Sequence, residues 1–97
     1  MEEVEVVYKG KKYKVVLGKI TYRQRNMILD KCTETVIDNG KPRAKLKYGI
    51  LEREVVVASI KKIEPPVNDV GAFVDDLDYD EAMKLVRVAM RLNPLLT

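Results

Sequence analysis

The chain has 97 residues, 46% of them hydrophobic and 34% charged, with a net charge of +3, which is the composition of one folded domain rather than a disordered chain. It contains no histidine, one cysteine (Cys32) and one serine (Ser59), which excludes a Ser-His-Asp triad, a Cys-His pair and a Cys/His zinc site within one subunit. We therefore expect a single domain over residues 1–97, not an enzyme, without a catalytic centre, metal site or cofactor.

The N-terminal residues predict a β-hairpin. Residues 4–8 and 13–17 are rich in β-branched and aromatic side chains, and residues 9–12 between them form a turn sequence. Gly10 supplies the unusual dihedral angles that a tight turn needs. Gly18 then ends the second strand.

A first helix is predicted to begin at Tyr22. Thr21 and Gln24 match a capping box, in which each side chain satisfies a backbone N–H group at the start of the helix. Apolar side chains recur at helical spacing as far as Val36, so we expect the helix to end between residues 33 and 36.

The pair Asn39-Gly40 predicts a second hairpin, since Asn-Gly is the strongest short-range signal for a two-residue hairpin turn. After it, cations alternate with uncharged residues at a period of two, which favours an extended segment that is basic on one side. Pro42 favours an edge strand or an arm. The alternating cations are Lys41, Arg43, Lys45 and Lys47.

Residues 50–63 are ambiguous between helix and strand. Leu51, Val55 and Ala58 fit one face of a helix, whereas three consecutive valines favour a strand on propensity. We predict a helix over this segment that ends before Pro65.

The last helix has the clearest pattern. Residues 78–81 match a second capping box, with acidic groups placed at the positive end of the helix dipole, and Asn93-Pro94 ends the helix. Before it, residues 67–77 favour a loop with one helical turn. The apolar stripe of the last helix consists of Ala82, Leu85, Val86, Ala89 and Met90.

Together these elements predict an α+β fold: an N-terminal β-hairpin followed by about three helices around one small core, with an additional hairpin suggested near residues 35–48. The chain has no apolar run long enough to cross a membrane, and its N-terminus lacks the basic flank and apolar stretch of a signal peptide, so we expect a cytoplasmic protein. Abundant Lys, Arg and Glu with a single glutamine suggest a thermophilic source.

Two local patterns favour structural explanations over chemical ones. Asp76, Asp78 and Asp80 resemble the opening of a calcium loop, but Glu81 replaces the required glycine and Arg87 replaces the closing glutamate. Helix capping explains these carboxylates better. The lone Cys32 lies on the apolar face of the first predicted helix, where a buried structural thiol is far commoner than a nucleophile.

Charge is unevenly distributed, at +6 for residues 1–53 and −3 for residues 54–97. The alternating cations, with the lysines of the first hairpin, could follow phosphates, and the tyrosines nearby could stack on bases. Lysine-rich strand edges also guard against aggregation. The alternative function is therefore a small basic nucleic-acid-binding protein that uses Lys41, Arg43, Lys45 and Lys47.

The order of elements also carries a resemblance to a known family. Its features are the strand Tyr13-Lys14-Val15-Val16-Leu17, a helix opened by Ile20-Thr21-Tyr22-Arg23-Gln24-Arg25, a middle segment over residues 51–60 that leads to Pro65-Pro66, and a last helix that ends in Leu92-Asn93-Pro94. In these respects the whole chain resembles the tail assembly chaperones of long-tailed phages and related virus-derived elements.

The resemblance implies a non-enzymatic chaperone that keeps the long, helical, apolar tape measure protein soluble and delivers it to the tail-tube subunits. It also implies a tendency to form homo-oligomers. Two amphipathic helices with adaptable Met and Tyr side chains suit such a partner, because they can present a groove to a helix. The candidate partner-binding residues are Tyr22, Met27, Ile28, Met83, Met90 and Leu92.

Overall fold

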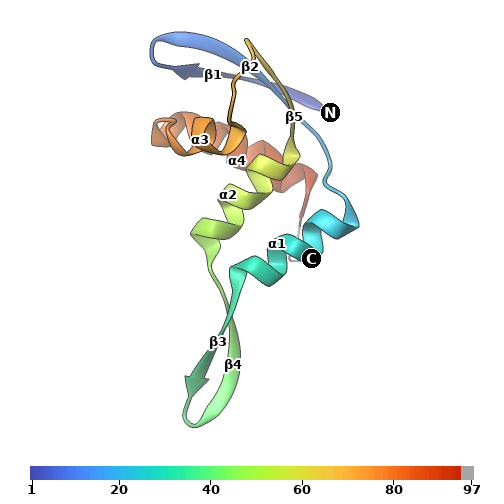
Figure 1. Cartoon of the computed structure of the whole chain (residues 1–97), viewed down its shortest axis with the longest axis vertical. Helices are drawn as coiled ribbons and strands as arrows, with labels where there is room; N and C mark the ends of the chain where they lie inside the picture. The colour runs from blue at the N-terminus through green and yellow to red at the C-terminus, as the bar shows by residue number, and fades with distance from the viewer. Residues whose placement is uncertain (95–97) are drawn as a thin grey trace.

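Two antiparallel sheets and four helices make up residues 1–94, the part of the chain that the computed structural model describes (Figure 1). The fold is α+β and begins with the predicted hairpin. In chain order the elements are β1 (Glu2–Tyr8), β2 (Lys11–Leu17), α1 (Tyr22–Cys32), β3 (Thr33–Asp38), β4 (Lys41–Leu46), α2 (Tyr48–Ser59), β5 (Ile60–Glu64), α3 (Val70–Asp75) and α4 (Tyr79–Leu92).

The larger sheet has the strand order β1-β2-β5, so β2 is central. The turn between β1 and β2 is confirmed: Lys9 and Gly10 both have positive φ, at 51° and 75°, as a type I′ turn requires. Alternate residues of the sheet face the core, and Val15, which is fully buried, lies opposite both Val4 of β1 and Ile63 of β5.

Helix α1 begins at Tyr22, as predicted. Both halves of the capping box form: the Gln24 N–H donates to Thr21 Oγ1 at 3.1 Å, and the Thr21 N–H donates to Gln24 Oε1 at 2.9 Å. The predicted end between residues 33 and 36 is wrong, because the helix stops at Cys32 and the chain continues directly into β3. Helical spacing persists up to Val36, but pairing of β3 with β4 decides the conformation of these residues.

Strands β3 and β4 with their turn form a separate arm, here defined as residues 33–46. The second hairpin is confirmed, with Asn39 and Gly40 at φ 53° and 77°. The arm extends the molecule to 51 Å in its longest dimension, against 25 and 21 Å in the others, and it projects away from the helices in Figure 1. None of its residues belongs to the hydrophobic core.

The ambiguous segment 50–63 divides into two elements. The prediction of a helix is confirmed as far as Ser59, but it is wrong for the residues that follow, which form β5. Pairing with β2 determines this boundary: the Gly18 N–H donates to the Ser59 carbonyl at 2.8 Å, and Leu17 then pairs with Ile60. The valines of residues 55–57 therefore stay helical despite their strand propensity, and the chain becomes a strand only at residues 60–64, where β2 offers an edge to pair with.

Helices α3 and α4 lie where the sequence predicts a helical turn and a long helix. The second capping box, however, does not form. Asp78 precedes α4 without making a side-chain cap, and Glu81 accepts a hydrogen bond from the Val7 N–H of β1 at 2.9 Å. The Glu81 carboxylate therefore ties the start of α4 to the edge of the sheet. The sequence had predicted that it would cap the N-terminus of its own helix.

The core lies between the sheet and the helices. Fully buried side chains come from the inner face of the sheet, from α2, from α4 and from the end of α1, and α4 packs against both β1 and α2. The predicted stripe of α4 is confirmed: Leu85 and Ala89 are buried, and the other three members pack against the core. Helix α1 packs on α2 at the end of the body from which the arm projects (Figure 1).

Candidate functional site

A cleft of about 220 Å³ lies between α1 and α2. Residues at positions 24, 27, 28 and 31 share one face of α1 because they follow the spacing i, i+3, i+4, i+7, and positions 54 and 58 share one face of α2. The capping box at Thr21 fixes where this face of α1 begins. The cleft is lined by Gln24, Met27, Ile28, Lys31, Glu54 and Ala58.

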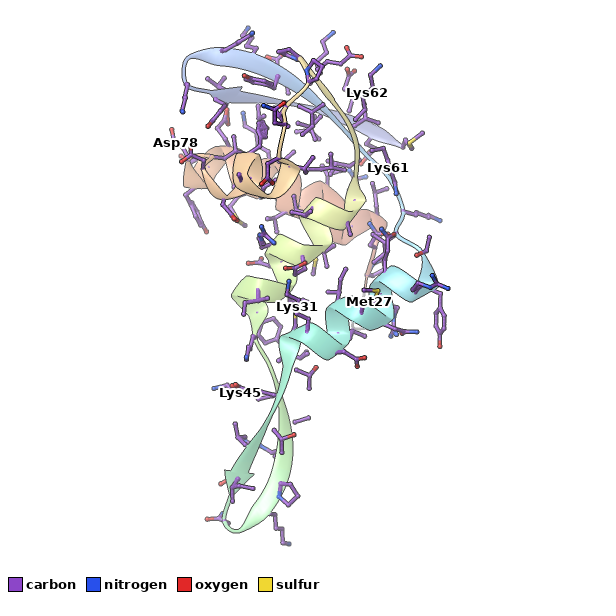
Figure 2. The ribbon with its side chains drawn as sticks, viewed as in Figure 1. Met27, Lys31, Lys45, Lys61, Lys62 and Asp78 are labelled. Carbon is purple, nitrogen blue, oxygen red and sulfur yellow. The ribbon has the colours of Figure 1, made fainter. Side chains whose placement is uncertain are left out.

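The floor and rim of the cleft differ in exposure. Ile28 is 5% exposed and forms part of the core, whereas Met27 is 65% exposed and stands beside it. Ala58 has only a methyl group, so α2 leaves space opposite these two side chains. Figure 2 shows Met27 and Lys31 on the same side of α1. A flexible thioether over an apolar floor suits contact with varied apolar side chains.

Charged side chains from both helices form a network at one edge of the cleft. Lys31 Nζ donates to Glu54 Oε1 at 2.7 Å, and Arg53 Nη1 donates to the same oxygen at 3.0 Å. Arg53 also holds Asp75 of α3 with two hydrogen bonds, at 3.0 and 3.1 Å. The hydrogen bond from Lys31, aided by Arg53 and opposed by burial, lowers the pKa of Glu54, so this carboxylate is ionised at neutral pH.

Cys32 lies one turn beyond Ile28 and is fully buried, as the sequence predicts. Burial, reinforced by the negative charge of Glu54, raises the pKa of its thiol. The thiol is therefore neutral at pH 7, and the chain has no histidine to activate it.

The structure separates the six predicted partner-binding residues. Met27 and Ile28 line the cleft, whereas Tyr22, which is 78% exposed, lines a hollow of about 170 Å³ between the start of α1 and the end of α4. The other three predicted residues, Met83, Met90 and Leu92, lie on α4, line neither space and are half-buried. Met90 and Leu92 pack against the core.

Asn93 has a role that its sequence pattern does not reveal. Its side chain is 7% exposed, accepts a hydrogen bond from the Ile20 N–H at 2.9 Å, and donates to the Gly18 carbonyl and to Ser59 Oγ at 3.2 and 3.0 Å. It therefore joins the ends of β2, α2 and α4 and positions the segment that leads into α1. Asn-Pro predicted only a helix end, since nothing local identifies distant partners.

For the nucleic-acid alternative, the structure keeps the four cations together on or next to β4 but places two of the tyrosines elsewhere. Tyr8 of β1 and Tyr13 of β2 contact each other and Phe73 of α3, with ring centroids 5.1–5.9 Å apart. These three elements lie at the opposite end of the molecule from the arm (Figure 1). On the arm, Arg43 pairs with Asp38 at 3.2 Å. Next to the arm, Lys47 pairs with Glu34 at 3.5 Å. Lys41 and Lys45 have no ion-pair partner among residues 1–94.

A larger hollow of about 530 Å³ lies beside α3, lined by Tyr8, Phe73, Asp69, Asp75 and Asp76 with their neighbours. Its acidic groups are engaged: Asp76 accepts from the Tyr8 hydroxyl at 2.7 Å, Asp75 binds Arg53, and Asp69 caps α3. Nowhere in residues 1–94 do three or more potential His, Cys, Asp or Glu ligands gather around one point.

Comparison with known proteins finds no matching family, no matching characterised protein and no matching solved structure. The α1–α2 cleft is therefore assigned from its geometry alone. No helix within the described part of the chain combines the length and the apolar character needed to cross a membrane.

Proposed function

We propose that this protein is a non-enzymatic assembly chaperone of a phage-like element, which binds an apolar helical protein of the tape-measure type and passes it to tail-tube subunits. The observation that supports this proposal most directly is the α1–α2 cleft, with Ile28 at its floor and Met27 exposed at its rim. The order of elements, which resembles that of tail assembly chaperones, supports it as well.

The dimensions of the cleft suit side chains rather than a whole helix. A space of about 220 Å³ accepts one or two apolar side chains from a helix that lies across α1 and α2. This is the helix-in-groove mode, in which anchors spaced by three or four residues enter an apolar groove. Glu54 and Lys31 pair at the edge and leave the floor uncharged, so the cleft favours apolar anchors flanked by polar residues.

Co-expression with a long apolar tape-measure protein tests the proposal. The wild-type chain should yield a soluble complex, and Met27→Glu should weaken it by about thirtyfold in Kd, because an unpaired carboxylate in an apolar contact costs roughly 2 kcal/mol. Tyr79→Glu is the matched control, since Tyr79 is 76% exposed on α4, away from the cleft, and should leave the complex intact.

Both variants change an exposed side chain, so their melting temperatures should stay close to that of the wild type. Failure of the wild-type chain to solubilise any tape-measure-type protein would refute the function. A complex that tolerates Met27→Glu and is lost with Tyr79→Glu would instead refute the assignment of the cleft.

A second candidate function, nucleic-acid binding by the arm, is supported by Lys41 and Lys45, which are exposed and form no ion pair with any residue of 1–94. It predicts binding to DNA or RNA that weakens steeply with salt, because phosphate contacts release counterions. Absence of binding at about 50 mM salt, where such contacts are strongest, would eliminate it.

A further inference from the structure

The two faces of the arm differ completely in charge. Directly opposed residues of antiparallel strands share a face, and alternate residues along each strand share it too. The register pairs Glu34 with Lys45 and Val36 with Arg43, which places every charged residue of the arm on one face. The opposite face, here called the uncharged face, consists of Thr33, Thr35, Ile37, Pro42, Ala44 and Leu46.

The uncharged face has no cover within residues 1–94. All its members except Leu46 are exposed, Ile37 is 71% exposed, and the arm takes no part in the core. A two-stranded hairpin is marginally stable by itself in water and gains stability when one face packs on another element. No element within residues 1–94 packs on this face, which leaves it open to a second molecule.

We propose that the uncharged faces of two copies of this chain pack against each other. A two-fold interface brings the same surface of both copies together, so the surface must tolerate a copy of itself. The uncharged face meets this condition. The other face does not, because Lys41 and Lys45 would meet equivalent cations, and the lysines of β4 also oppose edge-to-edge pairing of two arms.

The shape of the molecule determines how the two copies are oriented. Stacked sheets lie about 10 Å apart, whereas the body of each copy is 21–25 Å thick. If both bodies lay at the same end of the stacked arms, they would collide. The arms must therefore overlap antiparallel, with the two bodies at opposite ends of the stack. Six paired residues give an overlap of about 20 Å, and the dimer of two 51 Å molecules is then about 80 Å long.

The area of the contact limits its strength. A two-stranded face of six residues measures roughly 20 by 10 Å, so the stacked arms bury about 400 Å² in total. Stable complexes bury about 1,200 Å² or more. The dimer should therefore dissociate on dilution, and its stability should not fall as salt is raised, because no charged side chain lies in the contact.

Light scattering and X-ray solution scattering of the purified chain, over a concentration series up to about 500 μM, test the proposal. We expect the mass to rise toward that of a dimer while the maximum dimension rises to about 80 Å. Ile37→Lys should remove the dimer and raise its dissociation constant at least about tenfold, since it places two like charges in the contact. Val36→Lys is the matched control, because it puts the same new side chain on the opposite, charged face, and it should keep the dimer.

Three results would overturn the proposal: a monomer throughout the series, a dimer that is lost with Val36→Lys but not with Ile37→Lys, or a dimer that weakens steeply as salt is raised. Because the arm lies outside the core, both variants should melt at the wild-type temperature. The experiment uses the chain alone, so its outcome is independent of the proposed chaperone function.

Discussion

Asn93→Ala should be one of the most destabilising single substitutions in this chain outside the apolar core. The Asn93 amide group carries two hydrogens and its oxygen accepts from the Ile20 N–H, so the side chain can satisfy about three hydrogen bonds at once. Each contributes about 1 kcal/mol net, and buried groups left without a partner cost more. The free energy of unfolding should therefore fall by about 3 kcal/mol, out of the 5–15 kcal/mol typical of a domain.

Thermal unfolding followed by circular dichroism measures this effect. A loss of 1 kcal/mol lowers Tm by about 4–8 °C in a chain of this length, so Asn93→Ala should melt roughly 12–24 °C below the wild type. Asn68→Ala is the matched control, because Asn68 is exposed in the loop before α3 and should change the free energy by less than about 0.5 kcal/mol. A change below about 1 kcal/mol for Asn93→Ala would refute the view that this side chain holds three segments together.

The remaining predictions concern the turns, the charge network and the thiol. Gly10→Ala should lower the free energy of unfolding by about 1–2 kcal/mol, because φ is positive at Gly10. Gly40→Ala should leave the global Tm unchanged, because the arm lies outside the core. Equal shifts in Tm for the two variants would contradict this. The pKa of Glu54 in the folded protein is lowered from 4.5, so ionised Glu54 stabilises the fold above pH 4.5, and this effect is lost as pH falls through the folded-state pKa. The difference in Tm between wild type and Glu54→Gln should therefore persist at pH 7 and vanish in acid. Cys32 should react with iodoacetamide at least about tenfold more slowly in the native protein than in denaturant, and equal rates would show that the thiol is accessible.

Elements whose signals are local were predicted well from the sequence. The capping box at Thr21 and the Asn39-Gly40 turn each depend on residues within four positions of one another, and the structure reproduces both. The end of α1 and the start of β5 depend instead on strands that pair across the chain. Thr33 pairs with Leu46, and Ile60 pairs with Leu17, so no window around either boundary contains the deciding partner.

The same distinction applies to the cleft. Helical periodicity identified Ile28 and the flexible thioether singled out Met27, both on α1. Periodicity also placed Ala58 on a helical face, but it did not indicate that Ala58 and Glu54 of α2 complete the space. Periodicity shows which residues share a face of one helix and gives no information about which second helix lies opposite. Glu81 shows the opposite kind of error. Its local sequence matches a capping box, but its carboxylate accepts a hydrogen bond from the backbone of β1, which no local pattern indicates.

The uneven distribution of charge along the sequence is largely cancelled within the fold. The cations of residues 1–53 meet the carboxylates of residues 54–97 in four ion pairs, so part of the difference between +6 and −3 is neutralised by contact between the two segments. These pairs are Lys9–Asp76, Lys31–Glu54, Arg53–Glu54 and Arg53–Asp75. Lys41 and Lys45 take no part in such pairs within residues 1–94, and both lie on the charged face of the arm. Their position opposite the uncharged face means that stacking of two arms would leave these lysines in water, where they keep further strands from adding to the edge and limit the assembly to two copies.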